Sequence, residues 1–324
     1  MALRTKTISG RRYYYIDLSY SVFNGSKTFS RYVGVKKPSS ARASAIERSF
    51  KSEIAVRVAG RRCGVKLITK DDMIRSFLFR NAFNSVFSSL PAAQKRRYEI
   101  ENTIRFALTT LTTEDVEVDL RDVQNAFEKS GRLSARERIS KNMLKAIESI
   151  KEKRPLDKNH LLELHRTIMV GFEGKTPGRM RKKQVYLRVQ NAENPFGKEI
   201  GYRPPNPAAL NGLIDQFVTW YASTDLNPVE KAALAHYKLY RIHPFLDGNK
   251  RMCRLILNKT LLDAGFPLLN ISEKKERYFQ SLISAVESAA PKGLAEFILK
   301  ELFRQTKEFL TVHGAPAPRR RVPP

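Results

Sequence analysis

Apolar residues recur at intervals of three and four along most of the chain after residue 70. This period is typical of helices that bury one face and expose the other. Asp157 suits the N-cap of one helix, and Gly265 suits the end of another. The pattern predicts a mainly α-helical fold, with helices over residues 72–88, 97–110, 119–128, 136–151, 158–171, 208–222, 228–241, 249–263, 273–288 and 292–310.

The first forty residues follow a different pattern. Residues 11–35 alternate in polarity and are rich in tyrosine, valine and threonine, with Asn24-Gly25 between two runs. This arrangement predicts a β-hairpin, and a helix is predicted to follow over 41–58. We therefore expect three parts: a small basic α/β module over 1–70, a main helical domain over 71–311 and a disordered basic tail over 312–324.

Charge is concentrated at the start of the chain. The 324 residues carry a net charge of +27, and residues 1–100 hold 21 lysines and arginines against 6 aspartates and glutamates. Cations interleaved with tyrosines suit a nucleic acid, whose phosphates attract cations and whose bases stack on aromatic rings. The same residues also suit tyrosines that pack on a helix beside solvated cations, or a surface that docks a protein.

The two cysteines, Cys63 and Cys253, show no disulfide spacing, which is typical of a reducing compartment. The sequence contains no run of about 20 apolar residues, so no membrane span is predicted. The N-terminus has cations but no apolar signal segment. We therefore expect a cytoplasmic protein without a membrane partner.

Residues 243–254 carry the most chemistry. They read His-Pro-Phe-Leu-Asp-Gly-Asn-Lys-Arg-Met-Cys-Arg and lead into an apolar helical run. A helix N-terminus binds phosphate through its free N–H groups and its dipole, and Gly248 and Asn249 suit the tight turn before it. Arg251 and Arg254 share one helix face and can both reach phosphate oxygens.

Two further residues suit phosphate chemistry. Asp247 can hold Mg²⁺ against phosphates, and His243 can accept a proton near neutral pH. Together they indicate a site that binds a polyphosphate and moves a proton. A charged loop with a structural histidine is the other interpretation, and it is less favoured for the whole ordered set.

The motif resembles the signature of the Fic family, His-Pro-Phe-x-Asp/Glu-Gly-Asn-Gly/Lys-Arg-x-x-Arg, and meets every fixed position. The resemblance implies a Fic-type helical bundle with a β-hairpin flap. It also implies transfer of AMP from ATP to a Ser, Thr or Tyr hydroxyl of a target protein. His243 would be the base and Asp247 would position Mg²⁺. The implied nucleotide site comprises Gly248, Asn249, Lys250, Arg251 and Arg254.

Upstream segments extend the resemblance. Pro177-Gly178-Arg179 is similar to the family's approach to the flap, and Tyr202–Pro207 is similar to its exit. The flap between them is implied to dock the target as an added strand. It comprises Gln184, Val185, Tyr186, Leu187 and Arg188.

Lys250 leaves the transferred group open. Most AMP transferases of the family have glycine here, whereas lysine occurs in the Doc toxins, which resemble Fic proteins but phosphorylate their targets. Doc motifs generally lack the final arginine and the Asp-Gly pair. Arg254 and Asp247-Gly248 therefore favour AMP transfer, with a Doc-like phosphotransferase as the alternative.

Many Fic proteins carry a helix with the pattern Ser/Thr-x-x-x-Glu-Gly/Asn, whose glutamate pairs with the last arginine of the motif. Glu101-Asn102 matches the last two positions, although Arg97 stands where Ser or Thr is expected. The resemblance implies an inhibitory helix over about 95–110, with Glu101 against Arg254. An ordinary surface ion pair is the other interpretation. In some members this glutamate aligns water to remove AMP, so de-AMPylation is also implied.

A different class of function stays open. The Fic core could be dormant in a regulator that binds nucleic acid through residues 1–70. The sequence names no target protein, and it leaves the oligomeric state open, a homodimer included.

Overall fold

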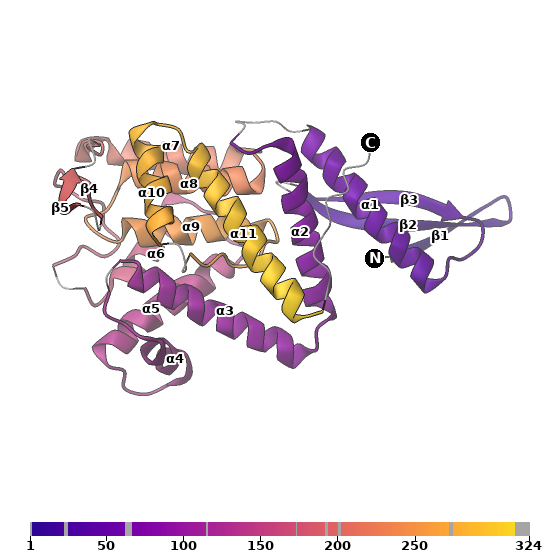
Figure 1. Cartoon of the computed structure of the whole chain (residues 1–324), viewed down its shortest axis with the longest axis horizontal. Coiled ribbons are helices and arrows are strands. Elements are labelled where there is room, and N and C mark those ends of the chain that lie inside the picture. Colours follow the sequence, from indigo (N-terminus) through magenta and orange to yellow (C-terminus); the bar gives the residue numbers. More distant parts are fainter. Residues whose placement is uncertain are drawn as a thin grey trace.

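The computed structural model describes residues 2–22, 25–61, 67–114, 116–172, 174–191, 194–199, 202–271 and 275–314. Within these ranges the chain forms eleven α-helices, one short 3₁₀ helix and two small antiparallel sheets (Figure 1). The predicted mainly α-helical fold is confirmed. From residue 315 on, the predicted tail lies outside the described residues.

A three-stranded sheet extends from the helical body (Figure 1). It comprises β1 (Ala2–Ile8), β2 (Arg11–Val22) and β3 (Gly25–Gly34), in the antiparallel order β1-β2-β3. The hairpin of β2 and β3 lies where the alternation predicts it, with Asn24 of the predicted turn outside the described residues. Strand β1 was not predicted, because its two large apolar residues, Leu3 and Ile8, fall on opposite faces.

One face of this sheet is covered by helix α1 (Ser40–Arg61). Ile16 and Leu18 of β2 are buried in the same apolar cluster as Phe50 and Ile54 of α1. Because side chains alternate across a strand, the neighbouring residues of β2 face away from the helix. The sheet therefore has one packed face and one open face.

The helical body contains all ten helices that the periodicity predicts. Five of them begin at a side chain that caps the first turn, such as Asp157, whose carboxylate accepts the His160 N–H at 2.7 Å. The helices are α2 (Lys70–Ser89), α3 (Ala92–Thr112), α4 (Leu120–Glu128), α5 (Ala135–Lys151), α6 (Lys158–Met169), α7 (Leu210–Ser223), α8 (Pro228–Ile242), α9 (Asn249–Asp263), α10 (Lys275–Glu287) and α11 (Lys292–Val312), with η1 (Pro207–Ala209) before α7.

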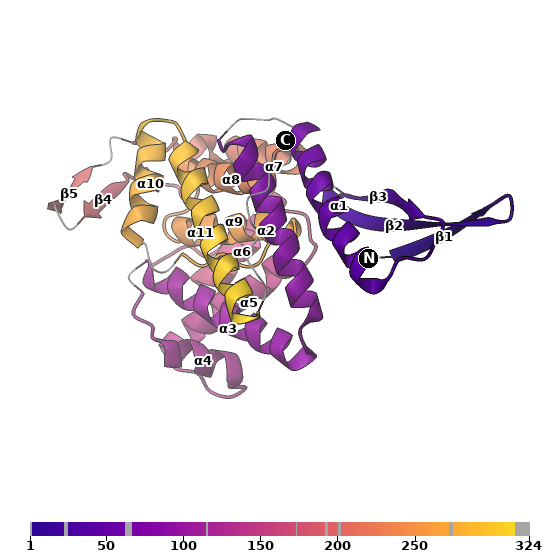
Figure 2. The same ribbon diagram turned by 45° about the vertical axis from the view of Figure 1, so that its right-hand side comes forward.

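Helices α8 and α9 form the centre of the body, α11 packs on α8, and α2 packs on α11 (Figures 1 and 2). Leu255, Ile256 and Leu257 of α9 are fully buried. A helix that is surrounded in this way has no solvent face. Polar residues in its first turn must therefore pair inside the protein or face an internal site.

A second, two-stranded sheet lies between α6 and α7. It is formed by β4 (Arg188–Asn191) and β5 (Asn194–Glu199). Both strands fall in the region between Pro177 and Tyr202 where a flap is implied.

One apolar cluster runs from Ile16 of the sheet through Phe77 of α2 to Ile256 of α9. The boundary expected at residue 70 coincides with the start of α2. The division into two domains stays a prediction. Among the described helices, none combines the length and apolar character that a membrane crossing requires.

Candidate active site

The loop between α8 and α9 holds the first half of the 243–254 motif. It begins at His243, which ends α8 with φ 48° and ψ 59°, and it ends at Gly248, the N-cap of α9, with φ 78°. The Asn249 side chain closes the loop: its Oδ1 accepts the Phe245 N–H at 3.0 Å and its Nδ2 donates to the Phe245 carbonyl at 2.8 Å. The Asn249 amide therefore holds the loop in shape, and only its backbone remains to face a phosphate.

Gly248 is required at its position for two reasons. Its left-handed backbone strains any residue with a Cβ. A Cβ would also lie 2.7 Å from Met169 Sδ and 3.4 Å from His165 Nε2. The loop thus lies directly on α6, and the first N–H groups of α9 stay uncovered by side chain.

The His243 ring has a defined tautomer. Its Nδ1 lies 3.3 Å from the Tyr240 carbonyl oxygen, which can only accept, so Nδ1 carries the proton. Burial lowers the pKa of His243 to about 4, and the charges of Arg181 and Lys250 act in the same direction. The imidazole is therefore neutral at pH 7, with the lone pair on Nε2. This is the form that can accept a proton.

Asp247 stays ionised despite partial burial. Burial acts to raise the pKa of Asp247, but the charge of Arg251, the N–H of Gly248 and the charge of Lys175 outweigh it and hold the pKa below its usual value. Its carboxylate accepts the Gly248 N–H at 2.6 Å and lies 3.3 Å from Lys175 Nζ. The side chain is 32% exposed, so one carboxylate edge remains accessible.

Arg251 and Arg254 are almost completely buried, with 2% and 1% of their surfaces exposed. The Arg251 guanidinium lies over the Phe172 ring at 4.6 Å. Nε and Nη1 of both arginines are buried without a hydrogen-bond partner among the described residues. Burying such donors unpaired costs free energy. An anion with several oxygens, such as a polyphosphate, would satisfy them.

The carboxylate that meets Arg254 is Glu114. Arg254 Nη2 donates to Glu114 Oε1 at 3.0 Å and to the Thr110 carbonyl at 2.9 Å. The second oxygen, Oε2, lies 3.7 Å from Lys250 Nζ. Glu114 is 10% exposed in its side chain. It therefore takes up one of the Arg254 donors, Nη2.

The assignment of this contact to Glu101 is wrong. Glu101 lies on the outer face of α3, 60% exposed, and its Oε1 pairs with Arg97 Nε at 2.7 Å. Thirteen residues of helix rise separate it from Glu114, or about 20 Å, so the two carboxylates cannot exchange places. The interpretation of Glu101 as a surface ion pair holds.

A sequence signal for Glu114 existed. Thr110-x-x-x-Glu114 meets the Ser/Thr-x-x-x-Glu spacing that Glu101 fails. It was missed because Asp115 follows, where the pattern has glycine or asparagine. The position of Glu114, two residues beyond the last residue of α3, also removes it from the helical periodicity.

His165 of α6 supports the loop from behind and was not predicted as a site residue. The Gly178 N–H donates to its Nδ1 at 3.0 Å, so Nε2 carries the proton and donates to the Asp247 carbonyl at 3.0 Å. Its ring stacks on Phe245 with 3.5 Å between centroids. Burial lowers its pKa to about 4, so it remains neutral at pH 7. His165 thereby holds the loop in position against α6.

Arg181 joins the loop to the implied flap. Its Nε donates to the His243 carbonyl at 2.8 Å, and its Nη2 donates to the Pro205 carbonyl at 2.6 Å. Gln184 Nε2 donates to the Pro204 carbonyl at 2.8 Å. Both ends of the flap are therefore tied to the segment that carries His243.

The predicted flap residues do not all lie in the hairpin. Strand β4 begins at Arg188, and residues 184–187 are extended without a strand partner among the described residues. Tyr186 is 61% exposed and Leu187 is 7% exposed. Because β4 starts at Arg188, Gln184 belongs to the base of the flap, and docking of a target there stays a prediction.

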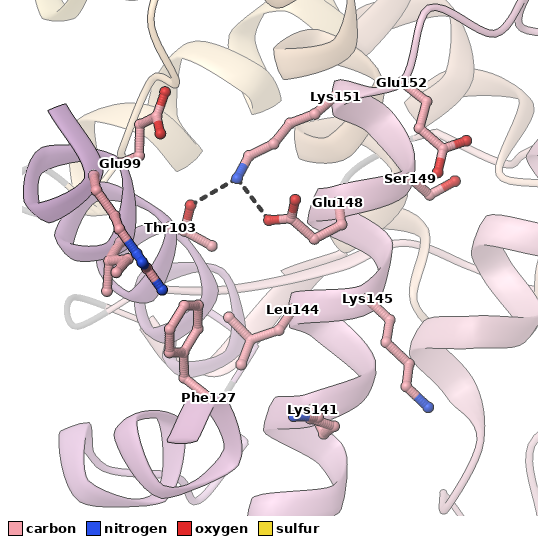
Figure 3. A pocket seen from close by; sticks show the side chains of 12 residues that line it. Glu99, Thr103, Phe127, Lys141, Leu144, Lys145, Glu148, Ser149, Lys151 and Glu152 are labelled. Carbon is pink, nitrogen blue, oxygen red and sulfur yellow. Dashed lines mark hydrogen bonds and ion pairs between the residues drawn. The ribbon is translucent and has the colours of Figure 1, made fainter. Parts of the chain in front are cut away.

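A pocket in the described part of the chain lies away from the motif. It has a volume of about 480 Å³ and is formed by α3, α4 and α5 (Figure 3). Lys151 lies at its edge and donates to Thr103 Oγ1 at 2.9 Å and to Glu148 Oε1 at 2.6 Å. None of the motif residues lines it.

Protein ligands for a metal are few. Within the ranges that the structure describes, no three histidine, cysteine, aspartate or glutamate side chains gather as a metal cluster. Mg²⁺ does not need such a cluster, since it often binds one or two carboxylates together with water and substrate phosphates. Asp247, beside two buried guanidiniums whose Nε and Nη1 lack a partner among the described residues, fits that mode.

The fold is similar to that of Fic proteins of known structure. A Fic domain containing signaling protein from Bacteroides thetaiotaomicron superposes with a TM-score of 0.61 at 23% identity, covering 76% of this chain and 100% of that one. Fic-1 from C. elegans superposes with a TM-score of 0.60 at 19% identity, covering 83% of this chain and 84% of that one. At these identities the likeness shows the fold.

The sequence comparison adds the family. Residues 155–261 match the model of the Fic/DOC family, so the chain contains a Fic/DOC domain. The protein named protein adenylyltransferase Fic of Drosophila erecta is 39% identical over 131 residues, or 39% of this chain and 24% of the relative. The Drosophila willistoni protein of the same name is 36% identical over 143 residues, or 43% of this chain and 26% of the relative. The chain spans about a quarter of the length of these curated relatives.

Proposed function

We propose that this chain moves AMP from ATP to a side-chain hydroxyl of a target protein, and that Glu114 restrains this activity. The observation that carries the proposal is the presence of two buried, partly unsatisfied arginines on α9, the helix that follows the loop, and of a neutral histidine at the start of that loop. The arginines supply charge for a polyphosphate and the histidine supplies a base. The names of the Drosophila relatives support the same reaction.

In the proposed reaction, the target hydroxyl oxygen attacks the α-phosphorus of ATP. A new oxygen–phosphorus bond forms, and the bond from the α-phosphorus to the bridging oxygen of pyrophosphate breaks. The hydroxyl proton goes to His243 Nε2, whose lone pair is set by the Nδ1–H donated to Tyr240. Pyrophosphate leaves with the electron pair, its charge stabilised by Arg251 and Arg254.

Asp247 would hold Mg²⁺ next to the phosphates. When bound, Mg²⁺ supplies positive charge against the phosphate oxygens and orients them. The chain's own contribution is the position of the carboxylate, which the Gly248 N–H and the His165 bond to the Asp247 carbonyl fix. The segment 184–187, which includes the exposed Tyr186, would receive the target as an added strand.

Glu114 would act as a competitive internal ligand. Its carboxylate takes one Nη of Arg254 and lies beside Lys250, so a phosphate must displace it before binding. Lys250 thereby gains a role that does not depend on phosphate transfer: it is a second cation on the restraining carboxylate. Phosphate transfer of the Doc kind and Glu114-dependent removal of AMP remain the alternatives that the experiment separates.

The experiment uses the full chain with ATP labelled at either the α- or the γ-phosphate and cell lysate as acceptor. Glu114→Ala should place the α-label on protein at roughly 5 to 150 times the wild-type rate, the range of a typical coupling free energy. Glu101→Ala is the matched control, since it removes an exposed carboxylate of the helix that precedes Glu114, and it should behave as wild type.

Other outcomes decide against parts of the proposal. Transfer of the γ-label alone would identify a phosphotransferase. Loss of α-label from pre-modified protein, dependent on Glu114, would identify a de-AMPylase. Equal activity of Glu114→Ala and wild type would overturn the restraint while leaving the reaction intact.

A further inference from the structure

The open face of the β1–β2–β3 sheet has no partner in the body of the protein. On β2, Ile16 and Leu18 point to α1, and Arg31 of β3 joins them there, pairing with Glu53 at 2.9 Å and lying over the Phe50 ring at 5.5 Å. The alternate residues of all three strands must point the other way. The strand register identifies them.

Three tyrosines occupy the centre of this open face. Tyr15 pairs with Arg4 on β1 and with Tyr32 on β3, and Tyr13 pairs with Lys6. The Tyr32 ring lies 5.5 Å from the Tyr15 ring and 6.1 Å from the Tyr13 ring. We call Arg4, Lys6, Tyr13, Tyr15 and Tyr32 the tyrosine face.

The tyrosine face continues into a basic hairpin tip. The turn between β1 and β2 is tight, with Ser9 and Gly10 both at positive φ, 49° and 75°. Lys6, Arg11 and Arg12 around it are exposed and make no ion pair with any described residue. In both ribbon views this tip is the part of the sheet farthest from the helical body (Figures 1 and 2).

The local charge has one sign. Residues 1–37 contain eight lysines and arginines and one acidic residue, Asp17. Asp17 is already paired with Arg4 at 2.8 Å. A concentration of unpaired cations at an exposed tip attracts polyanions over a Debye length, about 8 Å at physiological salt. The partner of this surface must therefore be strongly acidic and accessible to a protruding edge.

The shape of the face favours a duplex over a single strand. Single-stranded nucleic acid binds to sheets by stacking bases flat on free rings. Here the tyrosine rings are tilted by 46° and 54° and pack against each other, so they form a ridge and not a set of free platforms. Strands about 4.8 Å apart place β1 and β3 about 10 Å from each other, which matches a DNA major groove about 12 Å wide.

We propose that the tyrosine face and the β1–β2 hairpin tip bind duplex DNA, with Lys6, Arg11 and Arg12 on the phosphates and the tyrosine ridge in the groove. This proposal does not depend on the transferase activity. Failure of either leaves the other standing, because the two use different residues and different assays.

The test is fluorescence anisotropy of the full chain with a labelled 30-base-pair duplex at several salt concentrations. The variant Lys6→Gln/Arg11→Gln/Arg12→Gln should bind on the order of 100-fold more weakly near 0.15 M salt, and its log–log salt slope should fall by about 2.7, since each lost phosphate contact removes about 0.9. Tyr32→Ala, at a side chain that is 52% exposed, should weaken binding with unchanged melting temperature.

A matched control removes the same charge elsewhere. Lys292, Lys300 and Lys307 are exposed along α11, and their triple glutamine variant should bind within about threefold of wild type if position, not net charge, determines binding. Equal weakening by the two triple variants would overturn the proposal. Tighter binding of a 30-nucleotide single strand, or equally tight binding of polyglutamate, would also overturn it in favour of another partner.

Discussion

The motif loop and the hairpin tip are two cation-rich turns that place their charges in opposite ways. Around the loop, Arg251 and Arg254 are buried, and the loop that precedes them is held by the side chains of Asn249 and Arg181. At the tip, Arg11 and Arg12 are exposed and unpaired among the described residues. Buried guanidiniums suit one small anion in a fixed place, whereas exposed guanidiniums attract a long polyanion and can bind it at any position along its length.

Among the variants, His243→Ala should have the largest effect, and this effect should be confined to the motif loop. Loss of a general base typically costs 10²- to 10⁴-fold in rate, so transfer of the α-label should fall by about that factor in a Glu114→Ala background. Binding of ATP and of duplex DNA should change by less than about twofold, because the arginines and the tip are untouched. Retained transfer would show that another group accepts the proton.

A change of pH should act on the body and spare the tip. Burial lowers the pKa of His165 and His243 to about 4 and that of His236 to about 3. In the unfolded chain these groups titrate near 6.5, so the unfolded state takes up protons that the folded state does not as the pH falls from 7 towards 4. Stability should therefore be fully present above pH 6.5 and fall by on the order of 1–2 kcal/mol per histidine at pH 5.

The measurement is the free energy of unfolding from denaturant titrations at pH 7, 6 and 5. His236→Leu should lower the stability at pH 7 and reduce the pH slope, since one buried histidine no longer contributes. An unchanged slope would mean that His236 is protonated in the folded protein. Binding of DNA at the tip should change little between pH 7 and 8, where lysine and arginine do not titrate.

The smallest expected effect is a change in stability when a glycine is replaced by alanine. It distinguishes a glycine in a strained turn from a glycine in an unstrained helix. Gly248→Ala should destabilise the protein by about 1–2 kcal/mol, because of its positive φ and the contact with Met169. Gly212→Ala is the matched control in α7: a Cβ there meets nothing within 4 Å, and alanine should stabilise the helix by about 0.5–1 kcal/mol. Thermal melting measures both, and a shift of the same sign in the two variants would contradict the role of the turn.

The sequence by itself determined the helices and where the proposed chemistry is placed. Helical periodicity is local, so ten helices followed from spacing alone. The motif at 243–254 is equally local: its order of base, carboxylate, glycine and arginines indicated a polyphosphate site before any contact was known. Strand β1 escaped because its pairing with β2, and not an apolar alternation, determines it.

Only the tertiary structure decided which residues meet. Glu101 and Glu114 lie on the same stretch of chain, but the contact with Arg254 spans 140 positions and depends on how α3 packs against α9. The supporting roles of His165 and Arg181 are also long-range, as is the choice of sheet face that α1 covers. Periodicity and motifs record what a residue's neighbours along the chain require, whereas a partner far away in sequence is fixed by packing alone.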